Sequence, residues 1–152
     1  MIYLTSFFEE KVLPDDVRRF SAAVFQPKGY SFPKADWTDI RDSTGRWTRP
    51  RNFLGEDYPP ASYRSALLGI YNSRLHEARE WLETNESFDT ALLCWCPYDK
   101  AAQRQLKEWG SFICHTAVLG EFLSDTLAVP VWYDADRLNL TVLKQGYLNG
   151  VE

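Results

Sequence analysis

The fold is predicted from residues 90–96, with the sequence TALLCWC, and from residues 110–123, GSFICHTAVLGEFL, which follow them after a polar interval. The first segment holds an apolar run too short for a helix, and such runs are typical of a strand covered on both faces of a sheet. The second segment predicts a turn that places Cys114 and His115 at the start of a helix. In open α/β sheets, ligands bind outside the carboxyl ends of the strands, so we expect a site where the two segments meet.

Cys114 and His115 are the candidate catalytic residues. The first N–H groups of a helix have no partner within it, and the helix dipole is positive there. A thiol in that position loses its proton more easily, which makes Cys114 a candidate nucleophile and His115 a candidate acid, base or anion donor. A structural role for Cys114 is an equal alternative. The adjacent Cys-His pair is not a dyad signature, because neighbouring residues on a helix point in different directions.

The other two cysteines lie in the predicted strand. Cys94 and Cys96 would share one face of it, with Trp95 on the other. We interpret both as candidate ligand-binding residues, with core packing as the commoner role for Cys94. Together with Cys114 and His115 they form a set of four soft zinc ligands. Because the spacing is not that of a zinc finger, no metal site is predicted, and zinc stays a separate hypothesis.

The chain carries short motifs at five places, which are LLCWC at 92–96, FICHT at 112–116, EFL at 121–123, IYLTS at 2–6 and VFQPK at 24–28. These motifs resemble a family known as domain of unknown function 488, which has a Leu-Leu-Cys-aromatic-Glu strand followed by Cys-His-Arg opening a helix. In this chain Cys96 stands at the family's Glu position and Thr116 at its Arg position. The resemblance implies an α/β fold and a link to nucleotide or nucleic-acid metabolism, without an established reaction.

Composition favours one domain over residues 1–152. The chain is 45% hydrophobic and contains 9 Phe, 8 Tyr and 6 Trp, so we expect some aromatic rings to be exposed for binding. It has three cysteines, no basic and apolar leader, and no apolar run near ~20 residues. These features predict a cytoplasmic protein with reduced thiols and no membrane contact. The net charge of −4 argues against a general nucleic-acid binder.

Residues 26–60 predict one long Pro-rich loop, in which residues 26–55 hold six cations and three acids. The candidate ligand-binding residues of this loop are Lys28, Arg46, Trp47, Arg49 and Arg51. Aromatic faces stack on bases and Arg binds phosphate through two donors, so a nucleotide or phosphate contact is our hypothesis. The alternative is a solvated loop whose aromatic residues anchor it to the domain.

Asp134 is the last candidate ligand-binding residue, since it follows another predicted strand. Its carboxylate would orient a ribose, a cation or His115, although an Asp-capped turn is the commoner role.

The predicted strands lie near residues 2–8, 20–25, 90–96 and 129–133, and the firm helices lie near 60–84 and 115–126. This alternation predicts a three-layer α/β domain with a mostly parallel central sheet and helices on both faces. Residues 97–111 are interpreted as an insertion that includes a short helix, and residues 138–142 as an edge strand.

Two classes of function remain open. The first is a small cytoplasmic protein with a Cys-His site at a helix N-terminus, which binds or acts on a nucleotide or a nucleic-acid-related ligand. The second is a non-catalytic protein-binding or inhibitory module, such as those of phage and defence systems. The missing family Glu and Arg favour the second class. No cofactor is predicted, and the residue patterns indicate neither a reaction nor an oligomeric state.

Overall fold

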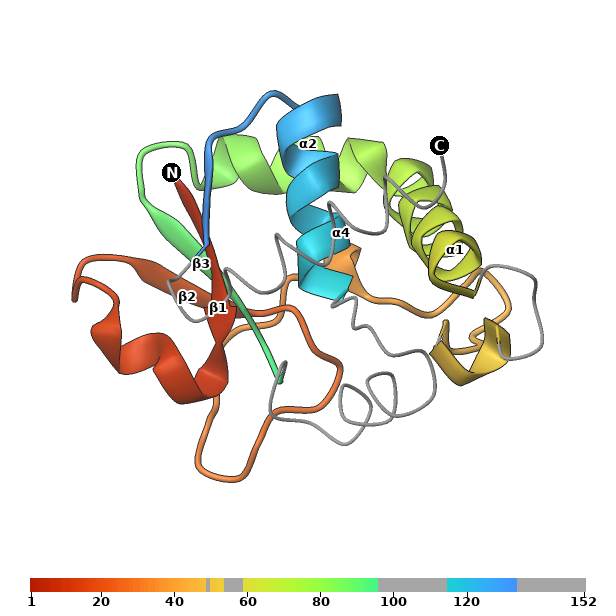
Figure 1. The fold of residues 1–152 in the computed structure, drawn as a ribbon. Coiled ribbons are helices and arrows are strands. Elements are labelled where there is room, and N and C mark those ends of the chain that lie inside the picture. The colour runs from red at the N-terminus through yellow and green to blue at the C-terminus, as the bar shows by residue number, and fades with distance from the viewer. Residues whose placement is uncertain (49, 54–58, 96–114, 134–152) are drawn as a thin grey trace.

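The computed structural model describes residues 1–48, 50–53, 59–95 and 115–133 (Figure 1). Its strands are β1 (Ile2–Ser6), β2 (Arg18–Ser21), β3 (Thr90–Cys94) and β4 (Val131–Tyr133). They form one sheet in the order β2-β3-β1-β4, and every pair is parallel. The prediction of an α/β fold with a parallel sheet is therefore confirmed.

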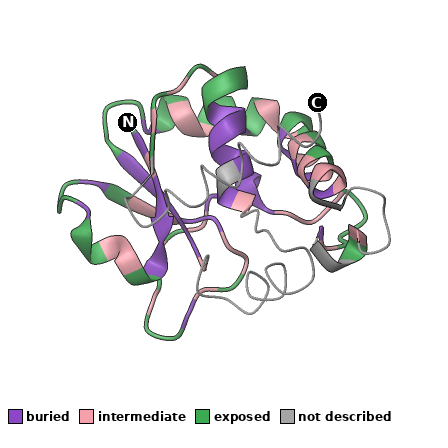
Figure 2. Ribbon diagram, viewed as in Figure 1, coloured by how far each residue is buried: buried purple, intermediate pink, exposed green. Residues whose placement is uncertain are grey.

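The two central strands are buried on both faces, which accounts for their apolar runs. In the register of β1 and β3, Leu4 lies opposite Leu92. Both pack into the core beneath the helices, whereas Leu93 and Trp95 pack into a second cluster on the opposite face. Trp95 thus lies on the face that the strand pattern predicts for it. Figure 2 shows the buried residues concentrated in the strands and on the helix surfaces that face the sheet.

The α-helices of the described ranges cover one face of the sheet (Figure 1). They are α1 (Pro59–Ser73), α2 (Leu75–Thr84) and α4 (His115–Glu121), and α4 continues into the π-helical segment η4 (Phe122–Thr126). Tyr71 and Leu119 are fully buried in this layer, and they join α1 to α4. No helix among these is long and apolar enough to cross a membrane.

The single helix predicted for residues 60–84 is divided at Arg74, whose backbone leaves the helical region with φ −114° and ψ 25°. The Arg74 guanidinium donates hydrogen bonds to the carbonyl groups of Trp37, Asp39 and Arg41. The break therefore coincides with a tertiary contact to the long loop, which the helical periodicity of the segment does not reveal.

The opposite face of the sheet is covered by the 3-10 helix η1 (Phe7–Val12) and by parts of residues 13–32. Phe7, Leu13 and Val17 are buried there against the sheet. Among the described residues, the α-helices thus lie on one side of the sheet, and the short 3-10 helix η1 lies on the other (Figure 1).

Strands β1 and β2 end earlier than predicted, because a serine at the carboxyl end of each strand turns the chain. Ser6 accepts a hydrogen bond from the Phe8 backbone N–H and caps η1, so β1 stops before residue 7. Ser21 accepts from the Ala23 backbone N–H and donates to the Ala23 carbonyl, which ends β2. The long loop holds two further 3-10 segments, η2 (Asp36–Thr38) and η3 (Pro50–Phe53). The helix and edge strand predicted near 99–109 and 138–142 lie outside the described residues.

Candidate functional site

The carboxyl ends of the parallel strands meet at one edge of the sheet, and aromatic residues follow three of these ends. Phe8 comes shortly after β1, Phe25 after β2, and Trp95 directly after β3. Phe8 is 45% exposed and Phe25 is 71% exposed. Large apolar side chains with this much accessible surface, placed where α/β sheets bind ligands, mark a candidate site.

These rings form a connected surface with two residues of the long loop. The Phe8 ring centroid lies 6.2 Å from Trp95 and 6.1 Å from Tyr30. The Trp95 indole N–H donates a 2.7 Å hydrogen bond to the Phe25 carbonyl. Phe25 and Trp47 stack at 6.1 Å with 22° between their planes. We call Phe8, Phe25, Tyr30, Trp47 and Trp95 the aromatic edge.

A cation lies over one end of the aromatic edge. The Arg41 guanidinium carbon is 5.7 Å from the centroid of the Trp47 ring, and a backbone bridge pairs the two residues. The Arg41 side chain also bonds the Asp39 carboxylate through Nε, at 3.0 Å to each oxygen. The loop therefore holds a guanidinium beside an aromatic face, an arrangement suited to an anion that also carries a ring.

Asp39 fixes the position of that cation. Burial would raise the pKa of its carboxyl, but hydrogen bonds from the Arg41 side chain and backbone N–H, and from Lys34, outweigh burial and hold the pKa well below its usual range. The Arg41 backbone N–H lies 2.9 Å and the Lys34 amine 3.2 Å from the carboxylate. The Arg74 guanidinium donates hydrogen bonds to the carbonyl groups of Trp37 and Arg41, so it attaches this part of the long loop to the helices.

Cys94 lies below the edge, within the core. Its sulfur is 3.2 Å from the Thr116 hydroxyl oxygen, and both residues are fully buried. This contact joins the end of β3 to the first turn of α4. The location agrees with the core-packing alternative for Cys94. Thr116 stands at the Arg position of the resembled family, and in this structure its side chain is fully buried.

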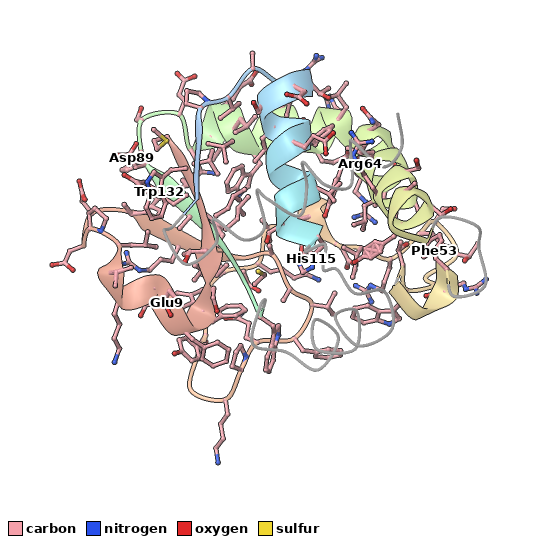
Figure 3. All side chains as sticks on the ribbon, in the orientation of Figure 1. Glu9, Phe53, Arg64, Asp89, His115 and Trp132 are labelled. Carbon is pink, nitrogen blue, oxygen red and sulfur yellow. The ribbon has the colours of Figure 1, made fainter. Side chains whose placement is uncertain are left out.

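His115 begins α4 and is half-buried, as Figure 3 shows at the start of that helix. Its carbonyl accepts a 3.3 Å hydrogen bond from the Tyr71 hydroxyl. Its Nε2 atom is buried and has no hydrogen-bond partner among residues 1–48, 50–53, 59–95 and 115–133. Six residues further along α4, Glu121 forms an ion pair with Arg64 of α1.

The remaining predicted site residues divide into two groups. Lys28 and Arg46 are exposed on the long loop, and Arg46 adjoins Trp47 of the aromatic edge. Outside the described residues lie Arg49, Cys96, Cys114, Asp134 and the side chain of Arg51. The structure thus places Trp47, with Arg46 next to it in the chain, at the carboxyl edge of the sheet. Cys94 lies beneath that edge and contacts Thr116, the residue after His115.

Pattern reasoning missed Phe8, Phe25, Trp95 and Arg41 as site residues. The first three were detectable, because each is an aromatic residue at or shortly beyond the carboxyl end of a predicted strand. Arg41 gave no comparable signal, since its role depends on the turn that brings it over Trp47. Within the described part of the chain, no group of three or more His, Cys, Asp or Glu side chains is placed to hold a metal ion. Two of the hypothesised zinc ligands fall outside that part.

No protein-family model, curated protein or solved structure matches this chain. The resemblance to domain of unknown function 488 therefore stays a prediction, and a functional assignment has to come from the geometry and chemistry of the site.

Proposed function

We propose that the protein binds a ligand carrying both a planar ring and a phosphate, such as a nucleotide, at the aromatic edge. The observation that carries the proposal is the stacked pair of Phe25 and Trp47 with the Arg41 guanidinium over Trp47. This group occupies the carboxyl edge of a parallel sheet, where α/β domains bind such ligands.

The ring of the ligand would stack on Phe25. That side chain is 71% exposed although its ring stacks with Trp47 and its carbonyl is held by Trp95. A ring held in position by its neighbours loses little conformational freedom when a ligand binds, which favours affinity. Stacking of a base on such a ring is worth about 1–3 kcal/mol.

The phosphate would contact Arg41 and Arg46. The hydrogen bonds from Arg41 to Asp39 use Nε and one terminal nitrogen, and a guanidinium has five N–H donors in total. The Arg41 side chain is 41% exposed, so donors remain for an anion. Arg46 is exposed beside Trp47 and adds a second positive charge.

A chemical step at Cys114 and His115 is a separate part of the proposal. Its support in the described structure is the His115 Nε2 atom, which is buried without a hydrogen-bond partner there. Thiol labelling of Cys114 against pH tests this part by itself. An ordinary pKa near ~8.5 would remove the nucleophile, and binding would be unaffected.

Binding is tested by calorimetric titration with nucleoside monophosphates and triphosphates, on the wild type and on Phe25→Ala. The matched control is Phe88→Ala, which removes another exposed ring, 44% accessible, two residues before β3. We expect Phe25→Ala to weaken binding at least roughly fivefold, and the control to bind as the wild type does. Absence of binding in the wild type, or equal effects of the two variants, would contradict the proposal.

A protein partner is the second candidate function, because exposed rings such as Phe8 and Phe25 are also typical of protein interfaces. The two candidates differ in their dependence on charge. A phosphate-bearing ligand should lose affinity in Arg46→Ala and at high salt, whereas an interface centred on Phe8 and Phe25 should depend mainly on the rings. A stoichiometric protein complex that tolerates Arg46→Ala would favour the second candidate.

A further inference from the structure

Three exposed cations lie close in sequence to three rings of the aromatic edge. Lys11 follows Phe8 by three residues, Lys28 follows Phe25 by three residues, and Arg46 adjoins Trp47. All three cations belong to the exposed class, although the chain as a whole carries a net charge of −4. Local positive charge interleaved with rings is typical of surfaces that bind a polyanion with aromatic bases.

The first position is set by the geometry of η1. A 3-10 helix has three residues per turn, so side chains three apart lie on the same side. Phe8 and Lys11 are three apart within η1, and both are exposed. The acids of this segment are partly engaged, since Glu10 binds Arg19 at 2.6 Å and Glu9 is half-buried.

The second position, at Lys28, is a turn that side-chain hydrogen bonds hold in place. The Gln26 side chain donates to the Phe32 carbonyl at 2.7 Å and accepts from the Phe32 backbone N–H at 2.8 Å. Within this clamp the Tyr30 backbone N–H bonds the Pro27 carbonyl, and Gly29 adopts φ +92°, which suits glycine alone. Lys28 is therefore held at the tip of a defined turn between two rings of the aromatic edge, Phe25 and Tyr30.

The third position is the tight turn that joins Arg41 to Trp47. The Asp42 carboxylate accepts hydrogen bonds from the Thr44 backbone N–H and hydroxyl and from the Arg46 backbone N–H. These bonds turn the carboxylate toward the backbone of its own turn and lower the pKa of its carboxyl. The guanidinium of Arg41 lies over the Trp47 ring, and the exposed Arg46 is adjacent to Trp47 in the chain.

We infer that the ligand of the aromatic edge is a single-stranded polynucleotide, an inference that rests on the proposed function and narrows it. A mononucleotide would use one ring and the cations near it. The edge offers three such positions, and ring contacts and the Trp95–Phe25 hydrogen bond connect them in one surface. A duplex would not occupy them, because its base faces are already stacked on one another.

The experiment is a length series measured by fluorescence anisotropy in competition with a labelled hexanucleotide. The competitors are uridine and thymidine oligonucleotides of one to six residues and a blunt duplex of adenosine and thymidine strands that is long enough to stay paired. We expect affinity to rise at least roughly fivefold for each nucleotide added up to about three, and to rise slowly beyond that. The stronger of the RNA and DNA series identifies the sugar, and either one supports the inference.

Salt dependence supplies a second measurement on the same samples. Neutralising three phosphates of a single strand predicts a slope of log K against log salt of about −2. Lys28→Ala should reduce the magnitude of that slope by about 0.7, whereas Arg79→Ala, an exposed cation on α2, should leave it unchanged.

The outcomes separate the inference from the proposed function. Mononucleotides that bind as tightly as trinucleotides, or a duplex that binds as tightly as a single strand, would overturn the inference and leave nucleotide binding intact. If neither mononucleotides nor oligonucleotides bind, both fail. Equal salt slopes for the wild type and Lys28→Ala would remove Lys28 from the contact and contradict the three-position arrangement.

Discussion

The indole N–H of Trp95 donates a 2.7 Å hydrogen bond to the carbonyl of Phe25, a residue 70 positions earlier in the chain. It joins the residue after the central strand β3 to the segment after the edge strand β2. The ring that we propose as the stacking position is therefore fixed through its backbone, while its side chain stays exposed.

Trp95→Phe should test that link, because it keeps an aromatic ring and removes the indole donor. We expect a loss of about 1 kcal/mol in the free energy of unfolding, a typical net value for one hydrogen bond. Ligand affinity should fall as well, since Phe25 would be less well positioned. Urea denaturation and the nucleotide titration measure the two effects. A variant with wild-type stability and wild-type affinity would show that the bond positions nothing.

Arg74→Ala should release the long loop from the helical layer. Its guanidinium donates to three loop carbonyls, including that of Arg41 at 2.6 Å, and these acceptors would be left without their partner. We expect destabilisation of about 1–3 kcal/mol, together with faster proteolytic cleavage within residues 37–47. Arg79→Ala on the exposed face of α2 is the control. Equal cleavage rates in the two variants would count against the anchoring role.

The lowered pKa of Asp39 predicts that the folded protein loses stability at acidic pH. Its pKa in the folded protein lies well below the ordinary value near ~3.9, so between the two values the unfolded chain binds more protons than the folded one. The stabilisation is complete above the unfolded pKa and is lost as pH falls towards the folded pKa. Asp39→Asn should therefore lose less stability than the wild type between about pH 5 and pH 2, as measured by urea denaturation. Asp36→Asn, which removes an exposed carboxylate of η2, is the control and should follow the wild type. A wild-type pH profile in Asp39→Asn would contradict the assignment.

Cys94 should be unreactive in the native protein, because its side chain is fully buried against Thr116. Mass-spectrometric mapping of alkylated peptides distinguishes it from the other two cysteines. We expect modification at Cys94 to require denaturant. Thr116→Val should cost about 1 kcal/mol of stability, since it removes the hydroxyl at that contact while keeping the side-chain volume similar. Rapid native alkylation of Cys94 would place its sulfur at the surface and contradict this packing.

The parallel sheet was predictable because buried strands leave a strong local signal. Residues 90–94 are apolar or small throughout, and all five are buried, as a central parallel strand requires. The ends of β1 and β2 were less predictable, since Ser6 and Ser21 stop them through hydrogen bonds that an aromatic and β-branched run does not reveal. The break at Arg74 was unpredictable for a related reason: its partners are carbonyls more than thirty residues away.

The residue types of the candidate site were easier to predict than its members. The mixture of cations and rings in residues 26–55 led to the hypothesis of an anion with a stacking group, which stays a proposal, and the structure places Trp47, with Arg46 next to it in the chain, at the carboxyl edge. It adds Phe8 and Phe25, which follow different strands and become neighbours of the site only when the sheet forms. The role of Arg41 depends on a turn and on Asp39, which residue types alone do not specify.

The central claim, that the aromatic edge is the binding surface, is tested most directly by the tryptophan indole N–H signals in a ¹⁵N spectrum titrated with a trinucleotide. The chain has six tryptophans. Trp47 and Trp95 belong to the edge, whereas Trp37 and Trp81 pack against the helical core. We predict that the signals of Trp47 and Trp95 shift progressively and those of Trp37 and Trp81 stay in place. Saturation of binding with Trp47 and Trp95 unmoved would contradict the account.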